Sequence, residues 1–357
     1  MLSNYLIERI YEFPVKQRLE EIRLEDKDLN VEQIPQIIHL FHPNKISWKL
    51  PLVLEGPDGT QINIESSSSS NVFYGRAPIN KNPIGWMLKK NNQEVFKNLL
   101  QHLLPCKEGS SYFNPSPWNL YSFLDDKLVR SEPGYVSQKI NEVSNENIAL
   151  ILDNKTLTIT HNFLNPKLYI INPFYIQEFD NFEGKFTSSG FSVELQETIS
   201  FVSDGLMEVE VKKGEMIIHN KGSRLVKIKG ENWKENKILQ FLWNLINEVF
   251  TVDCTIEKPI SLYEIIPYSV IPITINFVED KLLYIILFNA SDSPVFATFR
   301  IAAKIEKAFI TDIYGSEIEQ ILSEFDRIKI PMKRWGILPL KLEILKIPER
   351  LILRRAL

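Results

Sequence analysis

The side chains that could take part in chemistry are few, and those of the first third of the chain come in pairs. Asp26 and Asp28 are separated by one residue, and His39 and His42 stand three residues apart, which would put both imidazoles on one face of a helix. By residue type alone, the two aspartates are typical of an acidic loop or a helix cap. The two histidines have no evident carboxylate partner, and we interpret them as structural residues.

A further histidine, His102, lies near the end of an amphipathic helix that we expect over residues 93–104. The apolar side of this helix carries Phe96, Leu99 and Leu103. A lone histidine at a helix end is usually a surface or capping residue, and this is the interpretation that the helix pattern favours.

The cysteine and charge content narrows the class of protein. Cys106 and Cys254 are the two cysteines and have no CxxC spacing, which fits a reducing compartment and gives no zinc-finger signal. The formal net charge of −4 offers no global basic field for nucleic acid. No charged segment followed by an apolar run opens the chain, and no run of about 18 apolar residues occurs in it. We therefore expect a soluble, cytoplasmic protein without a nucleic-acid or membrane partner.

The length and the hydrophobic pattern predict a mainly β protein with a large core. The chain has 357 residues, enough for two or three domains, and 44% of them are hydrophobic. Short apolar or alternating runs with Gly, Asn and Asp at the joints predict strands. These strands cover residues 148–152, 156–160, 168–171, 205–211, 216–219, 225–229, 282–288, 295–305, 309–313, 328–330 and 337–344. Residues 235–250 differ, because they carry one helical stripe that we expect to pack on a sheet.

Residues 111–138 form the boundary between a first part of loops and helices and this β part. The prolines at the start of the segment favour turns or extended backbone. Trp118, Leu120 and Phe123 then follow at nearly alternating spacing, and we expect a half-buried strand there. Many short strands at regular spacing after this boundary predict a β-sandwich.

The same boundary carries a family resemblance. Its Asn-Pro-x-x-Trp entry over residues 114–118, followed by Pro-Gly-Tyr at residues 133–135, resembles the start of the C-terminal β domains of glycoside hydrolase family 38, the α-mannosidases. Residues 287–301, 307–321 and 328–344 resemble the closing strands and hairpins of that family, in the family's order. The resemblance implies β-sandwich domains over residues 111–357.

Residues 33–37, Gln-Ile-Pro-Gln-Ile, match a Gln-Leu-Pro-Gln-Ile-like segment of the family. In the family, the catalytic aspartate precedes this segment by a set distance, and the same distance in this chain leads back to Asp26. The resemblance implies that Asp26 is the catalytic nucleophile and also touches zinc. The family's neighbouring x-Phe-Gly is replaced by residues 27–29, Lys-Asp-Leu, so Asp26 keeps the chemical group but not its usual neighbours.

Two further segments resemble the family's catalytic domain. Residues 48–62 are similar to its Trp-x-Gly-x-Asp-Gly-Ser hairpin, in which Asp58 would be a turn residue. Residues 74–88 follow the spacing of its Tyr-Gly…Pro…Met-Leu segment, but the glycines are gone. The position of the family's acid–base aspartate holds Pro78, and a proline side chain cannot transfer a proton.

The segment over residues 101–110 resembles the one that supplies the family's zinc-binding histidine. The resemblance implies that His102 is a zinc ligand, although Leu103 replaces the aspartate that follows in the family. The family's first zinc motif, His-x-Asp, and its helical bundle are missing, so we expect an N-terminally truncated and divergent relative. Catalytic zinc usually has three protein ligands, and Asp26 and His102 are only two.

These observations predict an α+β, mainly β fold, with the remnant of an α/β catalytic domain over residues 1–110. The expected function is that of an α-mannosidase-like glycoside hydrolase acting on α-mannosides or glycans, impaired because one of its two carboxyl groups is missing. One alternative is a non-catalytic carbohydrate-binding or interaction protein, in which tryptophans could stack on sugars, although burial in the core suits most of them better. Another is one subunit of a split glycosidase, so the expected partners are a carbohydrate and a partner subunit or a second copy.

Overall fold

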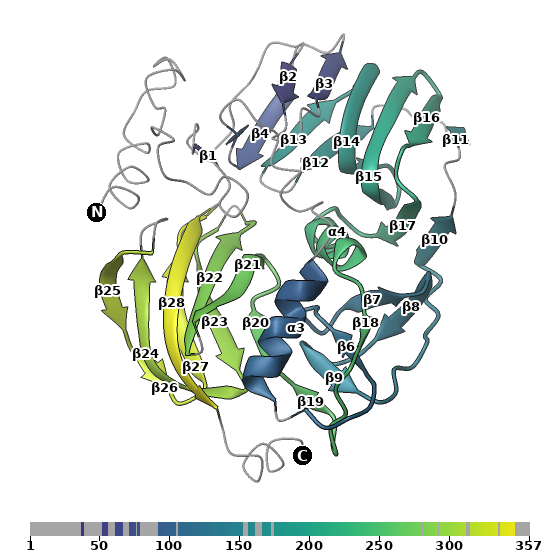
Figure 1. Ribbon diagram of the computed structural model, residues 1–357. Coiled ribbons are helices and arrows are strands. Elements are labelled where there is room, and N and C mark those ends of the chain that lie inside the picture. Colours follow the sequence, from purple (N-terminus) through teal and green to yellow (C-terminus); the bar gives the residue numbers. More distant parts are fainter. Residues whose placement is uncertain are drawn as a thin grey trace. The chain divides into compact units, whose positions relative to one another are not determined.

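The computed structural model describes a mainly β chain (Figure 1). The described residues are 37–38, 52–55, 61–66, 71–75, 77–78, 92–104, 106–152, 156–160, 166–172, 175–279, 281–291, 293–311, 315–334 and 336–346. The predicted mainly β character is confirmed for this part of the chain. The predicted α/β remnant over residues 1–110 falls mostly outside it and stays a prediction.

The chain forms two compact units, and it passes between them more than once. One unit contains the strands β1–β5 and β10–β17, and the other contains the helix α3 with β6–β9 and β18–β28. The later crossings lie between Val143 and Ser144 and between Leu242 and Trp243. The helix α3 thus shares a unit with the strands that follow residue 111. The predicted domain boundary between residues 110 and 111 is not one of these crossings.

The first unit, which we call the β15 unit, is built on an 11-stranded antiparallel sheet and a separate pair, β1 and β5. Its strands are β1 (Ile37–Ile38), β2 (Leu52–Glu55), β3 (Gln61–Ser66), β4 (Asn71–Gly75), β5 (Ala77–Pro78), β10 (Ile148–Leu152), β11 (Thr156–Thr160), β12 (Lys167–Asn172), β13 (Tyr175–Asp180), β14 (Gly184–Glu194), β15 (Thr198–Lys212), β16 (Glu215–Asn220) and β17 (Arg224–Gly230). The strands β10 and β11 have the predicted bounds.

The strand β15 is the centre of this sheet, because it changes partner along its length. Its first half, Thr198–Ser203, pairs with β17, and its second half, Met207–Lys212, pairs with β16. The strand β14 pairs with both halves along the other edge of β15. The apolar positions of β14–β16 face one continuous core, in which the exposed fraction of each side chain is a few per cent at most. That core includes Phe186, Phe191, Phe201, Met207, Val209, Val211 and Ile218.

The second unit, which we call the α3 unit, contains three larger sheets and a hairpin. The elements are α3 (Asn92–Leu103), β6 (Ser111–Asn114), β7 (Tyr121–Leu124), β8 (Lys127–Arg130), β9 (Tyr135–Ser137), β18 (Phe250–Val252), β19 (Ile260–Ser261), β20 (Tyr263–Ile266), β21 (Val270–Glu279), β22 (Leu282–Asn289), β23 (Val295–Ile301), β24 (Ala303–Thr311), β25 (Glu317–Ile321), β26 (Ser323–Glu324), β27 (Arg327–Met332) and β28 (Ile337–Lys346). The sheet orders are β18-β6-β9-β19, β20-β23-β27-β26 and β21-β22-β28-β24-β25.

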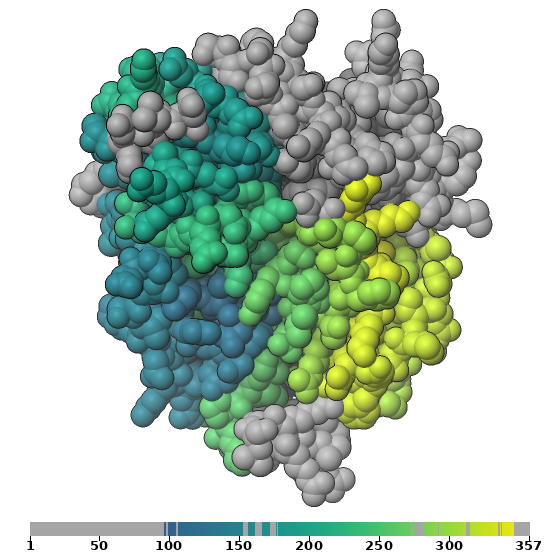
Figure 2. Space-filling view, turned by 180° about the vertical axis from the view of Figure 1, so that it is seen from behind, coloured from purple at the N-terminus to yellow at the C-terminus, as the bar shows by residue number. Residues whose placement is uncertain are grey.

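The sheet β20-β23-β27-β26 has the alternating burial of a β-sandwich. In β27, Ile328, Ile330 and Met332 are buried whereas Lys329 and Pro331 are exposed. The buried positions of β23 alternate in the same way. Figure 2 shows these C-terminal strands from behind, in green to yellow. This pattern is consistent with the predicted β-sandwich character.

Two predictions about local structure differ from the model. The expected strand over Trp118–Phe123 is a bend through Trp118 and Leu120 followed by β7, although all three apolar side chains are buried. The alternation of large apolar residues therefore predicted correctly that their side chains are buried. It did not predict the backbone conformation, because Pro117 starts a turn. The helix expected over residues 235–250 is the shorter α4 (Ile238–Ile246), whose apolar stripe is buried as predicted.

Candidate functional site

The segment that follows the nucleophile position in the family resemblance is paired in the fold with the segment that holds the expected acid–base position. Asp26 itself lies outside the described residues. The strand β1 begins at Ile37, the last residue of the matching Gln-Ile-Pro-Gln-Ile segment, and pairs antiparallel with β5 so that Ile37 lies opposite Pro78. Chain segments about forty residues apart are thus neighbours at the acid–base position, where Pro78 supplies no titratable group.

The predicted zinc ligand His102 is positioned by the packing of α3. Phe96, Leu99, Leu100 and Leu103 are buried on one side of the helix. Phe96 lies edge-on to Phe113, with ring centroids 5.8 Å apart. This apolar side fixes the rotation of the helix and leaves His102 half-buried in the last turn.

The ring of His102 stacks on Phe277 of β21, with 4.4 Å between the ring centroids and an angle of 11° between the planes. One face of the imidazole is therefore covered by an aromatic ring. Within the described ranges, no three His, Cys, Asp or Glu side chains form a group that could hold a metal ion. A zinc site shared by Asp26 and His102 stays a prediction.

The tryptophans considered for sugar stacking are mainly core residues. Trp118 and Trp243 are buried, and their indole N–H groups donate to the carbonyls of Val270 (3.3 Å) and Pro272 (3.0 Å). Both therefore anchor β21. Trp233 is half-buried. The centroid of its ring lies 5.5 Å from that of Tyr169, and the Lys234 ammonium lies 5.4 Å from the centroid of the Trp233 ring. Trp335 lies outside the described residues.

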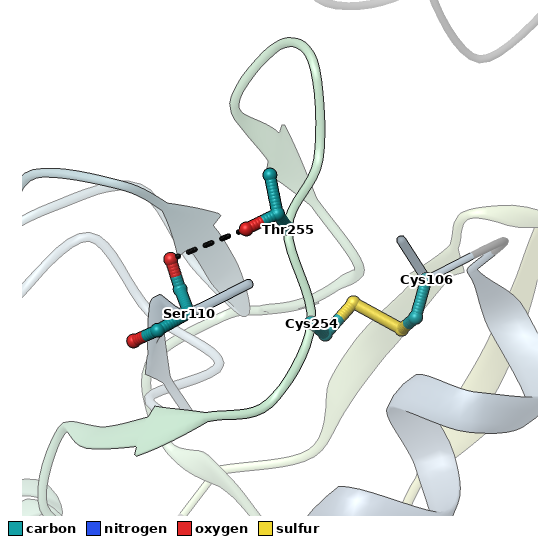
Figure 3. Close-up of a disulfide and its surroundings, with 4 residues drawn as sticks. All are labelled: Cys106, Ser110, Cys254 and Thr255. Atoms are coloured by element: carbon teal, nitrogen blue, oxygen red, sulfur yellow. Dashed lines mark hydrogen bonds between the residues drawn. A yellow bond between two sulfur atoms is a disulfide. The ribbon is translucent and has the colours of Figure 1, made fainter. Parts of the chain in front are cut away.

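The two cysteines form a disulfide, which the sequence did not predict (Figure 3). Cys106 follows α3, Cys254 follows β18, and their Cα atoms are 4.8 Å apart. The adjacent residues Lys107 and Thr255 exchange backbone hydrogen bonds. This bond removes the support that the cysteines gave to a reducing compartment, since disulfides are typical of oxidising ones. A cytoplasmic location stays a prediction. In the described part, no helix is long and apolar enough to cross a membrane.

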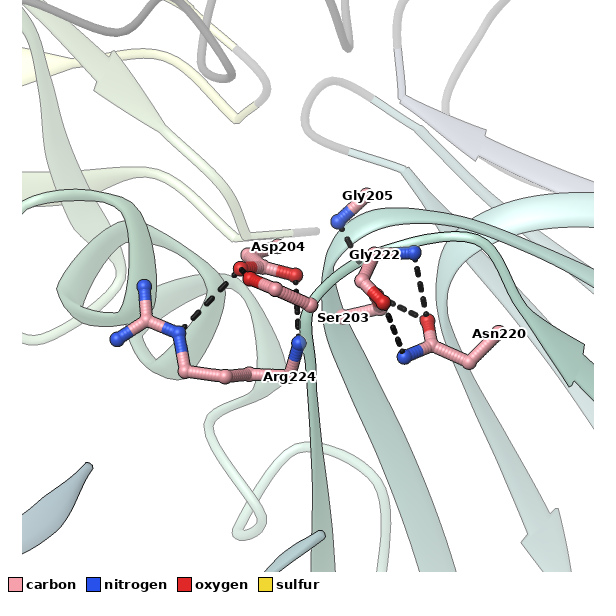
Figure 4. A network of polar contacts seen from close by, with 7 residues as sticks. Ser203, Asp204, Gly205, Asn220, Gly222 and Arg224 are labelled. Atoms are coloured by element: carbon pink, nitrogen blue, oxygen red, sulfur yellow. Dashed lines mark hydrogen bonds and ion pairs between the residues drawn. The ribbon is translucent and has the colours of Figure 1, made fainter. Parts of the chain in front are cut away.

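A polar network fixes the place where β15 changes partner (Figure 4). The Ser203 hydroxyl donates to Asn220 Oδ1 at 2.5 Å, and the Asn220 amide donates to the carbonyl of Gly222 at 2.9 Å. The backbone N–H of Gly222 in turn donates to Asn220 Oδ1 at 3.1 Å. Next to it, Asp204 forms an ion pair with Arg224 at 3.3 Å. The network sets the register in which Asn220 lies opposite Met207.

That register creates two rows of polar side chains on the face of the sheet opposite the core. One row brings together Thr187, Glu208 and His219, and the next brings together Lys185 and Glu210, with the apolar Ile217 opposite Glu210 on β16. The five polar side chains line a pocket of about 360 Å³, together with Phe186 and Val209. We call it the β14–β16 pocket.

The sequence patterns did not reveal the β14–β16 pocket or the place of His219 in it. The available signal was the alternation of Glu208 and Glu210 with the apolar Met207, Val209 and Val211. That pattern places both carboxylates on one face of a strand. It does not say which side chains of β14 and β16 lie opposite them.

No family model matches the chain, and no curated protein matches it. The resemblance to glycoside hydrolase family 38 therefore rests on the motifs and spacings of the sequence itself.

Proposed function

We propose that the chain is a glycoside hydrolase family 38-like protein directed at α-mannosides, with weak hydrolytic activity or none. The observation that supports this proposal is the pairing of β1 with β5. It makes neighbours of the end of the Gln-Ile-Pro-Gln-Ile segment, which follows the family's nucleophile motif, and of the acid–base position, with Ile37 opposite Pro78. A chance resemblance of two short motifs gives no reason for them to be adjacent in the fold.

The chemistry explains why the activity is weak. A retaining glycosidase needs one carboxylate as nucleophile and a second carboxyl group that protonates the leaving oxygen. Asp26 would be the nucleophile. Pro78 stands at the position of the second group, so the leaving sugar would depart without proton transfer from the protein there. General acid catalysis typically contributes a factor of about 10²–10⁴ to the rate.

The expected result with an aryl α-mannoside is slow hydrolysis that is lost in Asp26→Ala. An activated aryl leaving group needs little protonation, so it is the substrate on which a site without an acid would still act. Release of the aryl alcohol is followed by absorbance, with and without added zinc. Asp28→Ala is the matched control, because it removes a carboxylate two residues away and should leave the rate unchanged.

Hydrolysis that persists at the full rate in Asp26→Ala would contradict this assignment of the nucleophile. A His102→Ala variant tests the zinc prediction separately. If His102 is a ligand, this variant loses both bound zinc, measured by elemental analysis, and any stimulation by zinc. Unchanged zinc content in His102→Ala would show that His102 is only a packing residue of α3.

The second candidate is a non-catalytic carbohydrate-binding or interaction protein, or one subunit of a split glycosidase. Pro78 at the acid–base position and the stacking of His102 on Phe277 favour it. A folded protein with no hydrolytic activity would agree with this candidate. Native mass spectrometry would then distinguish a carbohydrate partner from a second copy or a partner subunit.

A further inference from the structure

We propose that the β14–β16 pocket binds an uncharged saccharide through adjacent hydroxyl groups. This site is separate from the proposed Asp26 site, and its assignment does not require hydrolysis. Only the choice of a mannoside as the first probe rests on the proposed function.

The two carboxylates of the pocket are hydrogen-bond acceptors, and both contact lysines. Lys212 and Lys185 both contact Oε1 of Glu210, at 3.0 and 3.7 Å. The pKa of Glu210 is lowered from its ordinary value, first by the hydrogen bond from Lys212 and then by the charge of Lys185. In Glu208, Lys221 likewise contacts Oε1. These lysine contacts are made to Oε1, and because a carboxylate offers about four acceptor sites, each glutamate keeps acceptor capacity for a ligand.

Donors stand opposite these acceptors across the strands. His219 lies beside Glu208 in the sheet, and its Nδ1 is 3.0 Å from the hydroxyl of Thr156, so the other ring nitrogen, Nε2, can bond a ligand. Lys185 lies beside Glu210, and the hydroxyl of Thr187 lies in the same row as Glu208. Donors therefore lie on both sides of Glu208 and on one side of Glu210. Such neighbouring donors and acceptors suit the hydroxyl groups of a sugar, because each hydroxyl both donates and accepts.

The charges of the pocket argue against ionic ligands. Each carboxylate is paired with lysine, so a cationic ligand would have to displace Lys221 or Lys212. An anionic ligand would meet both Glu208 and Glu210. A metal ion is disfavoured because the described side chains include no suitable group of three ligands. A neutral ligand with many hydroxyl groups keeps every one of these ion pairs.

The size and the floor of the pocket also suit a small sugar. A volume of about 360 Å³ lies at the lower end of the range for small-molecule sites, about 300–1,000 Å³. The side chains of Phe186 and Val209 belong to the core on the other side of the sheet, so their backbone forms the floor. The packed core below and the Asn220 network beside it keep the rows in place before a ligand binds.

The test is isothermal titration calorimetry, in which the whole chain is titrated with α-linked mannobiose and, separately, with maltose. We expect Glu210→Gln to weaken saccharide binding about tenfold, because one charge-assisted hydrogen bond is lost. Glu178→Gln is the matched control, since Glu178 is also a strand glutamate in an ion pair, with Lys167 at 3.2 Å, but it does not line the pocket. The affinity of the Glu178→Gln variant for the saccharide should equal that of the unchanged protein.

An Asp26→Ala variant separates this proposal from the proposed function. Binding that persists in Asp26→Ala and falls in Glu210→Gln supports the pocket, whether or not the protein hydrolyses mannosides. Binding of maltose alone supports the pocket and overturns the preference for mannosides. The proposal is overturned if neither sugar binds, or if Glu210→Gln binds as well as Glu178→Gln. It is also overturned if binding is lost only in Asp26→Ala.

Discussion

Replacing Cys254 by serine is expected to lower the free energy of unfolding of the α3 unit by about 2–5 kcal/mol. The bond joins residues separated by 148 positions, so its loss greatly increases the freedom of the unfolded chain. Cys254 is also 3% exposed, and the serine hydroxyl would be buried there. Urea denaturation followed by tryptophan fluorescence detects this loss, because Trp118 and Trp243 lie in the core of the unit.

The Cys106→Ser variant separates the two causes. Cys106 is exposed, so its replacement removes the bond without burying a hydroxyl, and the loss should be somewhat smaller than in Cys254→Ser. A reducing agent should lower the stability of the unchanged protein to a similar extent and leave both variants unaffected. Equal denaturation midpoints for the unchanged protein with and without a reducing agent would mean that the Lys107–Thr255 backbone bonds suffice to keep the segment in place.

Replacing Gly222 by alanine is expected to destabilise the β15 unit by about 3 kcal/mol and to weaken the saccharide binding proposed above. An added Cβ would lie 2.6 Å from the backbone nitrogen of Gly205 and 2.4 Å from the Ser203 hydroxyl, closer than real contacts allow. Overpacking of this kind costs typically 1–3 kcal/mol, and the Asn220 bonds would be disturbed as well. Thermal unfolding followed by circular dichroism at strand wavelengths measures the loss.

The matched control for Gly222→Ala is Ser223→Ala, at the next position of the same turn. Ser223 is exposed, and its hydroxyl donates to Asp204 at the surface. Removing an exposed hydroxyl should change the free energy of unfolding by no more than about 0.5 kcal/mol. If Gly222→Ala were as stable as Ser223→Ala, the turn would have room to shift, and the register of β15 with β16 would not depend on it.

Local sequence patterns predicted several of the strands but not their partners. The strands over residues 148–152 and 156–160 have the expected bounds, because alternation within a strand is a property of that strand alone. The disulfide joins positions 148 residues apart, and no local pattern reports that distance. The position of His219 opposite Glu208 likewise depends on the pairing of β15 with β16, in a register that the Ser203–Asn220 contact fixes.

The residues taken from the family resemblance have different outcomes. Asp26 lies outside the described part, so its role stays a prediction. His102 is in the expected helix, and its stacking on Phe277 could not be foreseen because β21 follows far later in the chain. The burial of Trp118 and Trp243 agrees with the expectation that most of the tryptophans belong to the core.

The alternation of the chain between its two units has a consequence for the order of events during synthesis. The strands β6 and β9 leave the ribosome early, but their sheet partners β18 and β19 come only after the whole of β10–β17. The nascent α3 unit therefore carries unpaired strand edges, and Cys106 a free thiol, until the residues beyond Trp243 emerge. Chaperones that shield strand edges, and enzymes that oxidise thiols, would have that interval in which to act.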